Sequence, residues 1–134
     1  MKVQWLDRAL ITGPYLALVT SPKEFRAAMR HCKISKKQSG CWLKTDAATA
    51  TLHYFNNDKG QMCCIVAVNA DGLAGVQVAA LLVHEAVHIW QQYRARICED
   101  SPSIEFEAYA IQSVSQILME AYFGRSGKSK QNWL

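Results

Sequence analysis

The sequence lacks any apolar run that approaches the roughly 18 residues needed to span a bilayer, so it predicts no transmembrane helix. Charged residues are also scarce, at 19% of the chain, whereas half of the residues are hydrophobic. This balance excludes an intrinsically disordered protein and provides enough apolar side chains for a core.

Paired cysteine motifs are missing as well. The five cysteines are odd in number and form no CxxC or CxxxC pair, although Cys63 and Cys64 are adjacent. The sequence therefore predicts neither a zinc ribbon nor a disulfide framework. We expect reduced thiols, most of them buried.

The length of 134 residues suits one domain, which we predict over residues 1–124, followed by a basic tail over 125–134. The first 19 residues resemble a signal peptide only loosely, because Asp7 and Arg8 interrupt the apolar pattern and no cleavage site follows. A cytoplasmic protein is therefore the expectation.

The net charge is only +4, and much of it lies in residues 33–37 and 125–130. Such clusters are typical of solvated loops and chain ends. A nucleic-acid patch is the less favoured interpretation. The sequence predicts no membrane partner and leaves the oligomeric state open.

Local punctuation and periodicity predict an α+β domain with a small, partly antiparallel sheet packed on helices. A Ser-Pro cap and an Asn-Asn-Asp-Lys-Gly turn are the clearest local signals. The predicted elements are a helix over 22–32, strands over 41–44, 50–55 and 62–68, and helices over 73–98 and 103–123.

The candidate metal-binding and catalytic residues lie in the predicted helix over 73–98. This helix is apolar nearly all round and is expected to be central and buried. It contains His84-Glu85-Ala86-Val87-His88, an HExxH pattern. Histidines four residues apart project from one helical face and can reach one zinc ion. Glu85 lies on a neighbouring face, where a carboxylate can accept a proton from zinc-bound water. The competing interpretation is a pair of hydrogen-bonded core histidines beside a solvated glutamate.

The next predicted helix contains Glu105-Phe106-Glu107-Ala108, and here the chain resembles the gluzincin branch of zinc metallopeptidases. In that family HExxH is followed by Glu-x-x-Ala on the next helix. The resemblance implies a minimal zincin fold, with His84, His88 and Glu105 as zinc ligands and Ala108 as the small residue that lets the helices approach. It also extends to small zincin-like proteins encoded by phages or mobile elements.

Two positions leave alternatives open. Glu107 could replace Glu105 as the third ligand, although Glu105 shares a helical stripe with Ala108. Several gluzincins have an aspartate where this chain has Tyr109. The Tyr109 hydroxyl is then a candidate either to orient a histidine or to stabilise the oxyanion of the transition state.

The resemblance implies hydrolysis of a protein or peptide substrate, with Zn²⁺ as cofactor and Glu85 as the general base. The spacing alone implies only metal-assisted hydrolysis. A second hypothesis is a zincin-fold binding or inhibitory protein whose metal site is structural or vestigial. The intact Glu85 favours the enzyme, since a non-catalytic site has no need of a base. A DNA-associated protease is a third possibility that the weak positive charge permits but does not support.

Overall fold

The computed structural model describes residue 3 and residues 13–126 of the chain. The signal-like segment with Asp7 and Arg8, and most of the predicted basic tail, lie outside the described residues. The elements in chain order are β1 (Tyr15–Val19), α1 (Pro22–His31), α2 (Lys36–Ser39), β2 (Ala50–Asn56), β3 (Met62–Val68), α3 (Gly75–Arg96), α4 (Ile104–Phe123) and a 3-10 turn (Gly124–Ser126).

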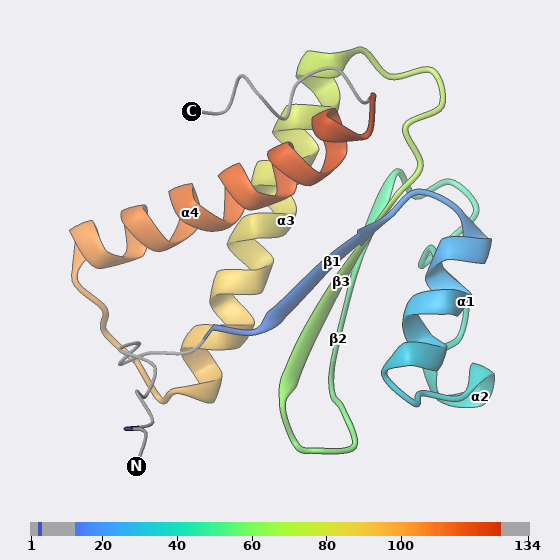
Figure 1. The fold of residues 1–134 in the computed structure, drawn as a ribbon. Coiled ribbons are helices and arrows are strands. Elements are labelled where there is room, and N and C mark those ends of the chain that lie inside the picture. Colours follow the sequence, from blue (N-terminus) through green and yellow to red (C-terminus); the bar gives the residue numbers. More distant parts are fainter. Residues whose placement is uncertain (1–2, 4–12, 127–134) are drawn as a thin grey trace.

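The three strands form one mixed sheet in the order β1-β3-β2 (Figure 1). The predicted hairpin is confirmed, since β2 pairs with β3 antiparallel, with Asn56 opposite Met62. Its turn is built around Asn57, whose side-chain oxygen accepts hydrogen bonds from the Lys59 and Gln61 backbone at 2.9 Å each. Gly60 completes the turn with a φ of +74°, a conformation that side chains disfavour.

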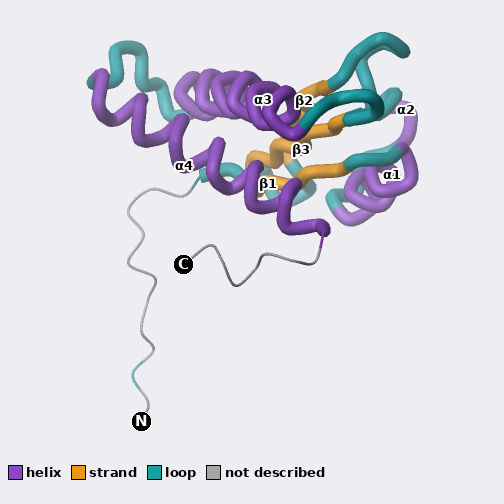
Figure 2. Tube along the Cα trace, turned by 90° about the horizontal axis from the view of Figure 1, so that it is seen from above, coloured by secondary structure: helices purple, strands orange, loops and turns teal. Residues whose placement is uncertain are grey.

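Helices cover both faces of the sheet (Figure 2). The side chains of β3 point alternately toward the helices on the two faces of the sheet. Cys64, Val66 and Val68 pack in a core cluster with α3 and α4. Ile65 and Ala67 pack instead in a second cluster with α1. Because both faces of β3 are covered, its side chains form a continuous apolar run rather than an alternating one, as the sequence predicts.

The two long helices begin and end close to their predicted positions. Ser103 caps α4, its hydroxyl accepting a hydrogen bond from the Phe106 backbone at 3.1 Å. The burial of α3 differs from the expectation, because only one face packs against the sheet. Val76 on the other face is 78% exposed. No helix among residues 13–126 is long and apolar enough to cross a membrane.

Two local predictions are wrong, and one strand was not predicted. The segment 41–44 is not a strand, because Leu43 is drawn into the core cluster of α1 and the Trp42 carbonyl accepts a hydrogen bond from His53 Nε2 at 2.8 Å. The presumed basic loop contains the short helix α2, and the edge strand β1 was not predicted at all. The α+β class itself is confirmed.

Candidate metal centre

His84 and His88 lie on the exposed side of α3, one turn apart, with their rings nearly perpendicular. Their Nε2 atoms are 3.2 Å apart. Two nitrogens bound tetrahedrally to one zinc at 2.0–2.1 Å would be about 3.3 Å apart. The two ring nitrogens therefore already have the separation of ligands to a single ion.

Gln91 orients the second histidine. Its Oε1 accepts a hydrogen bond from His88 Nδ1 at 2.9 Å. With the proton on Nδ1, the Nε2 lone pair of His88 accepts a hydrogen bond from His84 Nε2 at 3.2 Å, and a metal bound between the rings would replace the shared proton. A partner of this kind fixes the tautomer and ring position of a ligating histidine. The sequence signal for Gln91 is its position three residues after His88, on the same helical face.

Glu85 differs from the histidines in its environment. Its side chain is only 5% exposed. Burial raises the pKa of the carboxyl, an effect opposed by the nearby His84 and His88. The only fully buried side-chain oxygen without a partner among the described residues is Ser115 Oγ, so the Glu85 carboxylate is not such an atom. A carboxylate with a raised pKa is better matched to proton transfer near neutral pH.

The predicted third ligand lies apart from this pair. Glu105 is exposed in the first turn of α4, and no group of three potential metal ligands occurs among the described residues. Glu107 is already engaged, its Oε2 accepting a hydrogen bond from Trp90 Nε1 at 2.7 Å. Trp90 lies about 200° around the helix from His88, so the first turn of α4 contacts a different side of α3.

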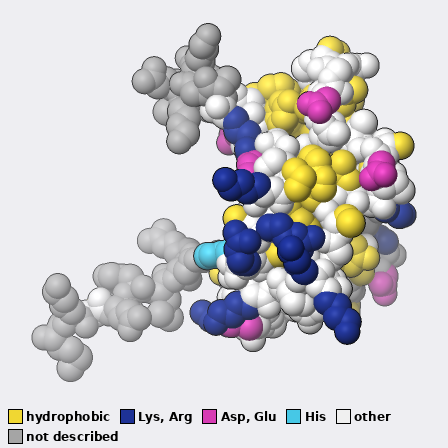
Figure 3. Space-filling view, turned by 90° about the vertical axis from the view of Figure 1, so that its right-hand side faces the viewer, with side chains coloured by type: hydrophobic (Ala, Val, Ile, Leu, Met, Phe, Trp, Pro, Cys, Tyr) yellow, Lys and Arg dark blue, Asp and Glu magenta, His cyan; other side chains and the backbone are white. Residues whose placement is uncertain are grey.

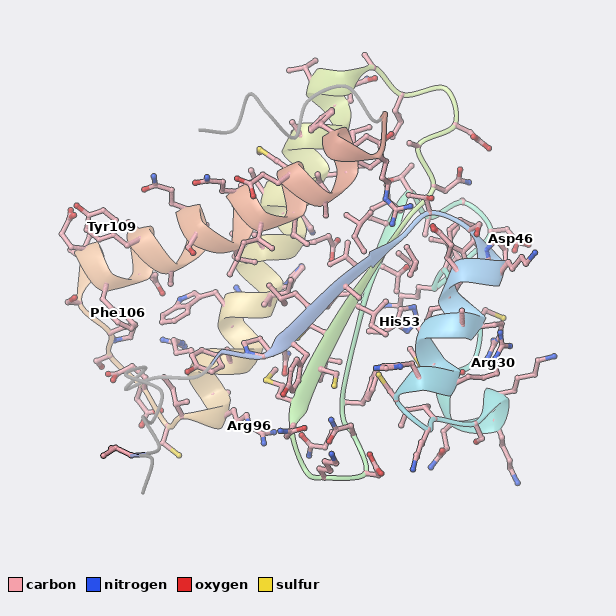
Figure 4. The ribbon with its side chains drawn as sticks, viewed as in Figure 1. Arg30, Asp46, His53, Arg96, Phe106 and Tyr109 are labelled. Atoms are coloured by element: carbon pink, nitrogen blue, oxygen red, sulfur yellow. The ribbon has the colours of Figure 1, made fainter. Side chains whose placement is uncertain are left out.

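Tyr109 also lies away from the histidine pair. It is 65% exposed and projects outward from the first half of α4 (Figure 4). Ala108 lines a shallow apolar groove of about 560 Å³ together with Val83 of α3. The role that the resemblance implies for Ala108 stays a prediction, and no contact in the described part of the chain places the Tyr109 hydroxyl near Glu85.

A second groove, of about 480 Å³, runs between α3 and the edge strand β2. It is lined by Tyr54 from the strand and by Gln92 and Arg96 from the helix. Arg96 closes one end by donating hydrogen bonds to the Asn56 side chain and to the Gly60 carbonyl, the latter at 2.7 Å. The outer backbone edge of β2 pairs with no strand in the described part of the chain.

No known protein family, curated protein or solved structure matches this chain. Any function therefore has to be argued from its own residues.

Proposed function

We propose that the protein is a zinc-dependent metallopeptidase whose metal is held by His84 and His88 on α3. The observation that carries the proposal is the 3.2 Å separation of the two Nε2 atoms, next to Glu85, a residue that is 5% exposed. Two neutral imidazoles at this spacing suit zinc, and an adjacent carboxylate whose pKa is raised by burial suits a general base.

Gln91 and Glu85 have different roles in the proposed reaction. Gln91 holds His88 in the tautomer that presents Nε2 to the metal. A zinc ion held by His84 and His88 would supply a Lewis acid for the carbonyl and would lower the pKa of a water on it to about 7. Glu85 accepts the proton from the attacking water and passes it to the leaving amine.

Glu105 remains the proposed third ligand, on the gluzincin resemblance alone, with Glu107 as its alternative. Either would require the first turn of α4 to approach His88 when metal binds. Such a shift would change the environment of Trp90, whose indole now donates to Glu107. A zinc-dependent change in Trp90 fluorescence, compared between the wild type and Trp90→Phe, is therefore expected.

The peptide substrate also rests on the resemblance, and one structural feature supports it. The unpaired edge of β2 lies beside α3 and can accept an extended peptide through main-chain hydrogen bonds. Tyr54 is exposed on this strand and lines the groove between β2 and α3. A substrate strand added to β2 would therefore run along the helix that carries the histidine pair.

The second candidate is a zincin-fold binding or inhibitory protein with a structural or vestigial metal. The observation that favours it is the absence of a third ligand beside the histidine pair in the described residues. The two candidates differ in one respect that can be measured. The enzyme cleaves a protein bound by the Glu85→Gln variant, whereas the binding protein leaves its partner intact.

The first test is zinc content after reconstitution, measured by elemental analysis. We expect about one zinc per chain in the wild type, and loss of zinc in His84→Ala and His88→Ala. His31→Ala is the matched control, since His31 is a lone exposed histidine at the end of α1. A wild-type protein that binds no zinc when zinc is in excess would contradict the proposal.

The same assay identifies the third ligand. Loss of zinc in Glu105→Ala but not in Glu107→Ala would support the resemblance, and the reverse would move the ligand by two residues. Retention of zinc in both variants would show that α4 contributes no ligand. If Glu105 is the third ligand, the ion joins α3 to α4. Removing zinc with a chelator should then lower the melting temperature reversibly.

A further inference from the structure

The face of the molecule opposite α3 and α4 is strongly basic. Residues 22–44 contain seven lysines and arginines and one glutamate, a formal net charge of +6. The whole chain carries +4, so the remaining residues together carry −2. Figure 3, which shows the molecule from the side of α1 and α2, has the lysine and arginine side chains gathered on this face.

The basic residues of α1 form one stripe. Lys23, Arg26 and Arg30 follow each other at spacings of three and four residues, so they share one side of the helix. Phe25 and Met29, which are fully buried, lie on the neighbouring side, about 100° around the helix. Packing of the apolar side against the sheet therefore fixes the basic side toward solvent.

Arg26 fixes the position of α2 relative to this stripe. Its guanidinium donates to the Ser39 hydroxyl at 2.8 Å and to the Gly40 carbonyl, and it lies over the Phe25 ring. A capping box between Ser35 and Gln38 defines the start of α2. The short helix thus presents its basic residues, Lys36 and Lys37, beside α1 in a fixed arrangement rather than on a solvated loop.

Few of these charges are neutralised within the described part of the chain. Lys33 forms an ion pair with Asp58 at 3.5 Å, and the single glutamate of the segment, Glu24, is paired with Arg125 at 2.9 Å. No carboxylate of the described residues pairs with the remaining members of what we call the basic face. Those members are Lys23, Arg26, Arg30, Lys36, Lys37 and Lys44, of which Arg26 donates to Ser39 and Gly40 instead.

We propose that the basic face binds the phosphate backbone of nucleic acid. Several unpaired cations on ordered helices match a polyanion with closely spaced charges, because each neutralised phosphate releases condensed counterions. A membrane fits less well. No large apolar side chain between residues 20 and 49 is exposed, whereas membrane-surface helices also insert apolar residues.

This inference is independent of the proposed peptidase, since the sheet separates the basic face from the histidine pair. Nucleic-acid binding should therefore survive His88→Ala unchanged. A chain that binds nucleic acid but no zinc would disprove the peptidase alone, and a chain that binds zinc but no nucleic acid would disprove this inference alone.

The test is fluorescence anisotropy of the full chain with a labelled 24-base-pair DNA duplex over a range of salt concentrations. We compare the wild type with Lys36→Gln/Lys37→Gln on α2 and with Lys128→Gln/Lys130→Gln in the last ten residues. Both variants lose two positive charges, so they differ only in where the charge is removed. Melting temperatures confirm that each variant is folded.

For the wild type we expect log K to fall linearly with log salt. In Lys36→Gln/Lys37→Gln the slope should be shallower by up to about 1.8, at roughly 0.9 for each phosphate contact removed. Lys128→Gln/Lys130→Gln should change it little. The inference is overturned if the wild type does not bind the duplex, or if both variants lose affinity equally. Equal affinity for poly-glutamate or for anionic vesicles would overturn it as well.

Discussion

The sheet has one helical layer on each face, and the two layers differ in charge and in the side chains they expose. We call the layer of α3 and α4 the α3 layer, and the layer of α1 and α2 the α1 layer. Residues 75–123, which form α3 and α4, carry six acidic and two basic residues, a net charge of −4, whereas residues 22–44 carry +6. The first layer offers imidazoles and a buried carboxylate, and the second offers unpaired lysines and arginines. The sheet thus separates an acidic layer, which carries the proposed metal site, from a basic layer, which carries the proposed nucleic-acid site.

The largest expected effect tests whether chemistry belongs to the α3 layer. In Glu85→Gln the side chain keeps its size but can no longer accept a proton from water. Hydrolysis should fall by about 10²–10⁴-fold while zinc content and fold are retained. The assay begins with casein and the protein's own chain as substrates, and zinc content is measured in parallel.

The control for this experiment lies on the other layer. Lys37→Gln removes a charged group from α2 and should leave hydrolysis unchanged. Equal cleavage by Glu85→Gln and the wild type would show that Glu85 is not the general base, and the two layers would then not differ in the proposed way.

The next largest effect concerns the packing of α3 on the sheet. Leu82 is fully buried against the sheet, whereas its neighbour Val83 is 37% exposed. Leu82→Ala should lower the free energy of unfolding by about 3 kcal/mol, because it removes apolar contacts and leaves a cavity. Val83→Ala should cost less than about 1 kcal/mol. Urea denaturation measures both, and similar losses would show that α3 does not rest on the sheet through this face.

A smaller effect isolates the role of Gln91. Gln91→Ala removes the acceptor for His88 Nδ1 and should weaken zinc binding by about tenfold, as is typical for partners of metal-binding histidines. Gln92→Ala is the control, since Gln92 lines the β2 groove instead. Competition with a fluorescent zinc chelator gives both affinities. If the two variants bind zinc alike, the hydrogen bond to His88 does not support the site.

The smallest effect belongs to the α1 layer and depends on pH. Burial lowers the pKa of His53 below its ordinary value of 6.5, an effect opposed by the Trp42 carbonyl and reinforced by Arg26. Between the folded and the unfolded pKa, the unfolded chain binds more protons. Stability should therefore decline as the pH falls below about 6.5.

His53→Gln tests this assignment, because glutamine retains a hydrogen-bond donor and does not titrate. Urea denaturation at pH 7.5 and 5.5 should show a smaller loss of stability in the variant than in the wild type. An identical loss would assign the pH dependence to groups outside the α1 layer.

Much of the fold follows from local sequence. The Asn57–Gly60 turn defines the hairpin, and Ser21 and Ser103 mark helix starts, because each signal acts through backbone groups a few residues away. The strand β1 was missed for the opposite reason. Its pairing with β3 depends on residues far along the chain, and nothing in Tyr15–Val19 alone specifies it.

In the candidate site, too, features set by nearby residues could be predicted and features set by distant residues could not. The helix fixes the spacing of His84 and His88, so their convergence could be predicted from the pattern alone. The placement of Glu105 depends on how α4 packs on α3, which no local pattern determines. Trp90 illustrates the point, since its indole engages Glu107 and holds the first turn of α4 on another side of the helix.

The mixed sheet has a consequence for synthesis on the ribosome. Tyr15 pairs with Cys63, 48 positions later, whereas the hairpin joins Asn56 to Met62, six positions apart. Closing the longer loop costs about 2 kcal/mol more. At roughly 5–20 residues per second, β1 leaves the ribosome about 2–10 s before its partner exists. The nascent chain must therefore carry an apolar strand unpaired until β3 emerges, and only then can the sheet be completed.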